Sequence, residues 1–150
     1  MMLRYLKGMI NRIMKTYSEL IQFSTFEDRF NYLKLHGNVG EDTFGFERYL
    51  NQKFYKSKEW KHIRDIVILR DQGCDLACLG HDIYGKVIIH HMNPITISDL
   101  ETNPDIVLNP EYLICVSQET HNALHYGDGS NLHKYDYEDR QPNDTSPWRR

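Results

Sequence analysis

The sequence predicts an α+β protein in which N-terminal helices precede a group of short strands and a last helix. Apolar residues recur at helical spacing through residues 1–72, and after residue 73 short apolar segments rich in β-branched residues replace this pattern. A capped helical pattern then follows over residues 118–126. Helices that precede a group of strands along the chain are typical of the α+β class.

The length and composition fit one domain. The chain has 150 residues, of which 40% are hydrophobic and 26% are charged, as in an ordinary globular domain. No apolar run is long enough to span a membrane, and the N-terminal segment has no secretory signal. Three cysteines, an odd number, favour free thiols in a reducing compartment, so we expect a cytoplasmic protein.

Residues 1–24 are predicted to form an amphipathic helix. Apolar side chains recur there at intervals of three or four: Leu3, Leu6, Ile10, Ile13, Met14, Tyr17, Leu20 and Ile21. This face could pack on the core, dock on a partner or lie on a membrane surface. The segment is not charged strongly enough to favour the membrane.

Residues 25–72 are predicted to be helical, with one basic face. Thr25 followed by Asp28 is an acidic variant of the capping box and begins a first helix, which Gly37 ends. Residues 38–45 are predicted to be a loop.

A second helix is predicted over residues 58–71. Ser57 can cap its start, and Gly73 closes it. Four apolar residues form its buried stripe: Trp60, Ile63, Val67 and Ile68.

Residues 75–77 and 86–91 are predicted strands, and residues 112–116 are a further candidate. Residues 92–111 are polar and contain three prolines, with one helical turn expected near residues 98–101. They therefore read as a long connection.

The last predicted helix covers residues 118–126. Ser117 can cap it, and Gly127 ends it. Residues 129–150 are polar, contain two prolines, and are predicted to be flexible.

Basic residues concentrate in residues 48–70, which hold seven Lys and Arg against two Asp and Glu, although the formal net charge is −3. Residues 71–147 hold thirteen acidic residues against three basic ones. Both a surface for a polyanion and a solvated helix face explain the basic block.

Four of the eight histidines form two informative pairs. His90 and His91 are adjacent at the end of a predicted strand, so their side chains should point to opposite faces or diverge there. His121 and His125 are spaced i, i+4 on a predicted helix, which stacks them on one face about 6 Å apart. Two helical imidazoles and one from the strand could hold a transition metal with open positions. Ordinary polar packing remains the alternative.

A metal held by neutral imidazoles keeps most of its positive charge, which suits stabilisation of the extra negative charge in phosphodiester hydrolysis. The adjacent histidine that does not bind the metal could act as a general base on water at physiological pH.

These residues lie in segments that resemble the HNH endonuclease family. The resemblance is carried by VIIHHMNPI at residues 87–95 and LNPEYLICVSQETHNALHYGD at residues 108–128. Upstream, FYKSKEWKHIRDIVILRDQGCDLA at residues 54–77 and TFEDRFNYLKLHGNVGEDTFGFERYLNQ at residues 25–52 resemble the HNH proteins of tailed bacteriophages. The histidine pattern is also similar to that of colicin DNase domains. The resemblance implies a ββα-metal (His-Me finger) nuclease core over residues 73–128.

By position, the resemblance implies that His90, His121 and His125 are metal ligands and that His91 is the general base. It implies one divalent metal (Mg, Mn, Ni or Zn) and DNA as the substrate, cleaved to leave 5′-phosphate and 3′-hydroxyl ends. Phage members often act alongside the terminase during packaging, which would place the chain in the bacterial host cytoplasm. The basic residues Lys56, Lys58, Lys61 and Arg64 could then contact DNA phosphates.

The chain departs from the family pattern at two places. Tyr112 stands where the family has an asparagine that tethers the loop aiming the general base, and Asn109 or Asn93 could replace it. Many members also carry two Cys-x-x-Cys pairs that bind a structural zinc. Here the first pair is Cys74 and Cys78, spaced one residue too far apart, and the places of the second hold Ser117 and Thr120. We therefore expect no structural zinc, with Cys74, Cys78 and Cys115 as small buried hydrophobic residues.

Two further functions remain open. Tyr112 and the acidic C-terminal half also fit a non-catalytic, metal-containing protein that binds DNA or assists a terminase. A toxin-like nuclease would need a delivery domain or an inhibitor protein, and the chain shows no delivery domain.

Overall fold

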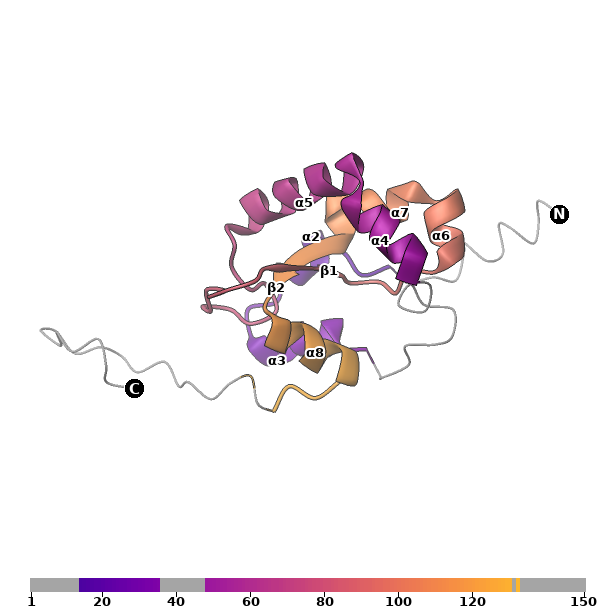
Figure 1. Cartoon of the computed structure of the whole chain (residues 1–150). Helices are drawn as coiled ribbons and strands as arrows, with labels where there is room; N and C mark the ends of the chain where they lie inside the picture. The colour runs from indigo at the N-terminus through magenta and orange to yellow at the C-terminus, as the bar shows by residue number, and fades with distance from the viewer. Residues whose placement is uncertain (1–13, 36–47, 131, 133–150) are drawn as a thin grey trace, which may run out of the picture.

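The computed structural model describes residues 14–35, 48–130 and 132. A two-stranded antiparallel hairpin lies between two groups of helices, with α5 on one side and α3 and α8 on the other (Figure 1). In chain order the elements are α2 (Tyr17–Leu20), α3 (Phe26–Leu33), α4 (Arg48–Lys56), α5 (Lys58–Asp71), β1 (Ile88–His91), α6 (Ile97–Thr102), α7 (Pro104–Leu108), η1 (Pro110–Tyr112), β2 (Leu113–Val116) and α8 (Gln118–Tyr126). The α+β class predicted from the sequence is confirmed.

The hairpin separates two hydrophobic clusters. In its register, His90 lies opposite Ile114 and His91 lies opposite Leu113. Because successive side chains of a strand point to opposite faces, one face packs against α3 and α8 and the other against α5. All four residues of β2 are buried because both of its faces are covered.

The two longest predicted helices of the core are confirmed, with their caps. The Ser57 hydroxyl accepts the Trp60 N–H at the start of α5, and the Ser117 hydroxyl accepts the Thr120 N–H at the start of α8. Helix α8 ends at Gly127 with φ of 73°, a conformation that glycine adopts without strain. Helix α5 ends at Asp71, as predicted, but the residue that caps this end is Gln72, in a left-handed conformation with φ of 56°, rather than Gly73.

Of the helix predicted over residues 1–24, the described part is helical only over Tyr17–Leu20. Residues 14–16 are not helical, and α2 contains only four residues. The Lys15 N–H donates to Asn93 Oδ1 at 2.8 Å, and Asn93 Nδ2 donates to the Lys15 carbonyl at 2.9 Å. The Asn93 side-chain amide thus binds both the N–H and the carbonyl of Lys15, which a helix would use for its own hydrogen bonds. Thr16 then caps the start of α2. Residues 1–13 lie outside the described residues.

The helix that Thr25 caps ends earlier than predicted. The Thr25 hydroxyl accepts the Asp28 N–H, as expected, but α3 stops at Leu33. The next residues are drawn to α8, since the Leu35 N–H donates to the Leu124 carbonyl at 2.8 Å. Gly37 and the predicted loop over 38–45 lie outside the described residues.

Helix α4 (Arg48–Lys56) follows that undescribed stretch and was not predicted as a separate helix. It falls within the 25–72 region that the sequence assigns to helices, and a single residue, Ser57, joins it to α5.

The predicted strand over residues 75–77 is also wrong. The Asp75 carboxylate accepts the N–H groups of Ala77 and Cys78, which folds this segment into a turn. The partner of β1 is instead the later candidate strand, present as β2. Between them, residues 92–111 contain more helix than expected, because a capping box formed by Thr96 and Asp99 starts α6.

Candidate metal centre

His90 is the buried member of a histidine cluster. Strand β1 turns its side chain to the α8 side of the hairpin, where the residue is 1% exposed. Its ring centroid lies 5.4 Å from that of His121 and 5.5 Å from that of His125, with both ring pairs nearly perpendicular. The strand thus places one imidazole directly over the helix that carries two.

His121 and His125 lie one turn apart on α8, as the i, i+4 spacing predicts. Their ring centroids are 4.4 Å apart, closer than the expected 6 Å, and their Nε2 atoms are 3.1 Å apart. Each of the three residues offers a ligand nitrogen, and these atoms all lie within 4.8 Å of one another. Within the described ranges, His90, His121 and His125 form a group that could hold a metal ion.

Two buried nitrogens of this group have no hydrogen-bond partner, namely His90 Nε2 and His121 Nδ1. A buried polar atom left in this way costs about 1–3 kcal/mol. A metal ion that accepts a lone pair from these rings would remove part of that cost. Imidazole nitrogens are ligands that suit zinc and nickel, so the donor set fits a transition metal better than magnesium.

Burial keeps these imidazoles neutral, which is the form that binds a metal. Burial lowers the pKa of His90 well below 6.5, and the neighbouring His121 and His125 lower it further. Burial also lowers the pKa values of His121 and His125.

His91 lies on the other face of the hairpin, so the prediction that the two adjacent histidines point to opposite faces is confirmed. Its ring stacks on Trp60 with centroids 5.3 Å apart and an interplanar angle of 18°. Its Nε2 lies 3.2 Å from the Val107 carbonyl. Because a carbonyl can only accept, Nε2 carries the proton and Nδ1 keeps its lone pair. Burial lowers the pKa of His91 to about 4, and the bond to Val107 opposes this shift.

The structure therefore brings together the three residues predicted as ligands and leaves the predicted base outside their group. His91 is half-buried, and its assignment as a general base stays a prediction.

The three residues considered for loop tethering make other hydrogen bonds than to the His91 ring in the part of the chain that the structure describes, and their tethering role stays a prediction. Asn93 pairs with the main chain of Lys15, and the Asn109 side chain accepts the Glu111 N–H at the start of η1. The main chain of Tyr112 accepts the Met92 N–H. The group that holds the His91 ring is the Val107 carbonyl, which the sequence could not indicate because any residue type offers a main-chain carbonyl.

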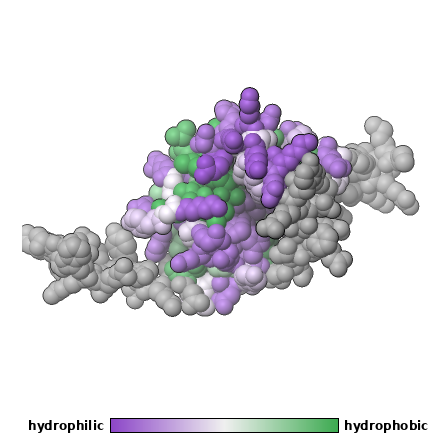
Figure 2. Space-filling view, in the orientation of Figure 1, coloured by the Kyte–Doolittle hydropathy of each residue, from purple (hydrophilic) through white to green (hydrophobic). Residues whose placement is uncertain are grey.

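The predicted DNA-contacting residues lie on α4 and α5. Lys56, Lys58 and Lys61 are exposed, and Arg64 is half-buried. Figure 2 shows hydrophilic side chains gathered over the start of α5. Trp60, between these lysines in sequence, is 4% exposed, which confirms its assignment to the core.

The cysteines are free thiols in different surroundings. Cys78 and Cys115 are buried, as predicted, and burial raises their pKa values to about 11 and about 12. Cys74 is only half-buried, so its assignment as a buried hydrophobic residue is wrong; its Sγ lies 3.5 Å from Asp82 Oδ1.

No protein family, curated protein or solved structure matches the chain. Within the described residues, none of the helices combines the length and apolar character needed to cross a bilayer.

Proposed function

We propose that the chain is a metal-dependent endonuclease of the HNH type that hydrolyses phosphodiester bonds in DNA. The observation that carries this proposal is the convergence of His90, His121 and His125, from a hairpin strand and the helix that follows it, with two of their buried nitrogens lacking a partner. Such a set leaves coordination positions open, as a catalytic metal requires.

In this proposal the three imidazoles hold one divalent cation. Bound there, a cation supplies Lewis-acid stabilisation of the negative charge that develops on the phosphate and on the leaving 3′-oxygen. The protein contributes the orientation of the rings: β1 fixes His90, and one turn of α8 fixes the other two.

His91 is the proposed general base. Its Nδ1 holds the lone pair that can take a proton from water, because Nε2–H is bound to the Val107 carbonyl. The stack on Trp60 fixes the plane of the ring. The exposed lysines of α4 and α5 would contact phosphates and give an affinity that falls with salt but does not read sequence.

The resemblance to tailed-phage proteins extends the proposal to genome packaging alongside a terminase, in the cytoplasm of a bacterial host.

Nicking of supercoiled plasmid DNA tests the proposal. The protein is first stripped with a chelator and then supplied separately with magnesium, manganese, nickel or zinc. We expect metal-dependent nicking whose rate His91→Ala and His121→Ala strongly reduce. His62→Ala, an exposed histidine on α5, serves as the matched control and should cut like the wild type.

A second candidate function is a non-catalytic, metal-containing protein that binds DNA or assists a terminase. The environment of His91 favours it, because burial lowers the pKa of this ring to about 4, which makes it a weak base. A wild-type protein that binds both metal and DNA but never cuts with any of the four metals would establish this alternative.

A further inference from the structure

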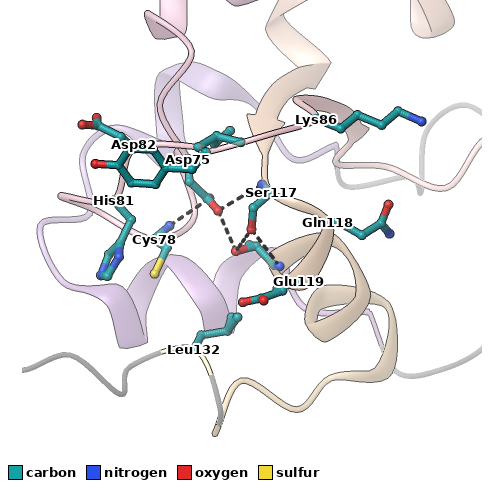
Figure 3. A pocket seen from close by; sticks show the side chains of 12 residues that line it. Asp75, Cys78, His81, Asp82, Lys86, Ser117, Gln118, Glu119 and Leu132 are labelled. Atoms are coloured by element: carbon teal, nitrogen blue, oxygen red, sulfur yellow. Dashed lines mark hydrogen bonds between the residues drawn. The ribbon is translucent and has the colours of Figure 1, made fainter.

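We infer that Asp75 is a positioning residue for the three-histidine group, because its carboxylate braces the joint between β2 and α8. The inference rests on the metal site of the proposed function and adds a residue that belongs to none of its ligands. Figure 3 shows Asp75 pointing at Ser117, at the start of α8.

The joint is short and decides the geometry of the site. Ser117 is the single residue between Val116, the end of β2, and Gln118, the start of α8. His90 lies on the hairpin, whereas His121 and His125 lie on α8. The angle at Ser117 therefore sets how closely the two helical rings approach the third.

The Asp75 carboxylate accepts four hydrogen bonds and is 4% exposed. Oδ1 accepts the N–H groups of Ala77 and Cys78 at 3.0 and 3.2 Å. Oδ2 accepts the Ser117 N–H at 3.1 Å and the Thr120 hydroxyl at 2.6 Å. One oxygen thus holds the turn to which Asp75 belongs, and the other holds the first turn of α8.

The bonds at the start of α8 form a closed set. The Thr120 hydroxyl donates to Asp75 and accepts the Ser117 hydroxyl at 3.0 Å, and the Ser117 hydroxyl accepts the Thr120 N–H at 3.1 Å. Thr120 is itself buried and is the residue directly before His121. A substitution of Asp75 should therefore displace Thr120 and, with it, the adjacent His121.

Asp75 can act as a brace because its own segment is anchored to the hairpin. The Leu76 N–H donates to the Cys115 carbonyl of β2 at 3.0 Å. From the other side, Arg29 Nη1 of α3 donates to the Leu76 carbonyl at 2.8 Å. The Asp75 carboxylate thus fixes the first turn of α8 relative to the hairpin.

Asp75→Asn is a sharp test because the change is nearly isosteric. In one amide orientation the new NH₂ group faces the Ser117 N–H, and in the other it faces the N–H groups of Ala77 and Cys78. In either orientation the NH₂ group, a donor, faces main-chain N–H groups, which are also donors, so these hydrogen bonds are lost. We expect zinc affinity, measured by competition with a chromophoric chelator, to fall by about 10- to 100-fold, the usual cost of removing support from metal ligands.

A structural role alone would lower stability without changing the coordination. We therefore also record the visible absorption spectrum of the full chain at saturating Co²⁺, which reports ligand geometry. Asp75→Asn should change this spectrum. Asp71→Asn is the matched control: Asp71 is equally buried and accepts the Cys115 N–H of β2, and its hydrogen bonds within the described residues go to Arg70 and Cys115 rather than to α8. It should leave the cobalt spectrum and zinc affinity unchanged.

The Thr120 pair decides the question if Asp75→Asn does not fold. Thr120→Val removes the hydroxyl that donates to Asp75 and should weaken zinc binding, whereas Thr120→Ser keeps it and should restore binding. Tight zinc binding and an unchanged cobalt spectrum in Asp75→Asn or Thr120→Val would overturn the inference while leaving the proposed function intact. A wild-type chain that binds neither metal would overturn both.

Discussion

The adjacent residues His90 and His91 have different surroundings on the two faces of the β1–β2 hairpin. On the α8 face, His90 meets two further imidazoles and keeps a buried nitrogen without a partner. On the α5 face, His91 has a carbonyl partner and an aromatic stack. Buried polar groups are normally satisfied by the protein itself. The first face thus carries a group that could hold a metal ion, whereas the second holds one ring in a fixed orientation and tautomer.

The largest effect should come from removing the His91 ring from the α5 face. We expect His91→Ala to lower the plasmid nicking rate by about 10²- to 10⁴-fold, the usual contribution of a general base, while zinc affinity stays at the wild-type value. Single-turnover nicking and a zinc competition titration measure the two effects. If His91→Ala also lowered zinc affinity, the metal-binding group on the α8 face would depend on the ring on the α5 face.

The next largest effect should come from the aromatic stack. Trp60→Ala removes a buried ring from the α5 face and should lower the free energy of unfolding by about 3–5 kcal/mol, as for other large core residues. Urea unfolding in the presence of a chelator measures the change. Tyr84→Ala, at a residue that is 93% exposed, should stay within about 0.5 kcal/mol of the wild type.

Acid should destabilise the protein, freed of metal by a chelator, through the histidines on both faces of the hairpin. The pKa values of His90, His91, His121 and His125 are lowered in the folded state, so below pH 6.5 the unfolded chain binds protons that the folded chain does not. The free energy of unfolding should therefore fall as the pH drops from 6.5 towards 4. His91, with a pKa of about 4, contributes about 3 kcal/mol at most.

Urea unfolding at several pH values checks this, and His91→Ala should show a shallower dependence over the same interval. A pH dependence that is the same in His91→Ala and the wild type would show that the α5 face does not titrate as expected.

The smallest effect should come from the surface beyond the α5 face. Lys58→Ala or Lys61→Ala should weaken DNA binding on every sequence alike and reduce the slope of log affinity against log salt by about 1. Fluorescence anisotropy with two unrelated duplexes at several salt concentrations measures both quantities. Loss of binding on one duplex only would instead indicate base readout.

Local signals in the sequence were sufficient for the elements that carry the histidines. Ser57 and Ser117 cap the helices that they were expected to cap, and the i, i+4 pair on α8 meets His90 as the spacing indicates. These features depend on contacts within a few residues, together with one strand that must face the helix.

What the sequence could not indicate depends on distant contacts. The helix expected near the N-terminus is interrupted by Asn93, and the segment expected to form a strand is folded by the carboxylate of Asp75. The stack of His91 on Trp60 joins α5 to β1, and the Val107 carbonyl has no side-chain signature. A periodic pattern cannot report such pairings, because they are formed only when the chain is folded.

Because Asn93 accepts the Lys15 N–H, the hydrogen exchange of that amide can report on the candidate metal centre. The two residues are 78 positions apart, and the Lys15 N–H is held by a side chain two residues beyond His91. That proton should exchange with deuterated solvent only when the end of β1 loosens. Its exchange rate, followed with and without zinc, would therefore report whether an ion on one face of the hairpin tightens the strand that both histidines share.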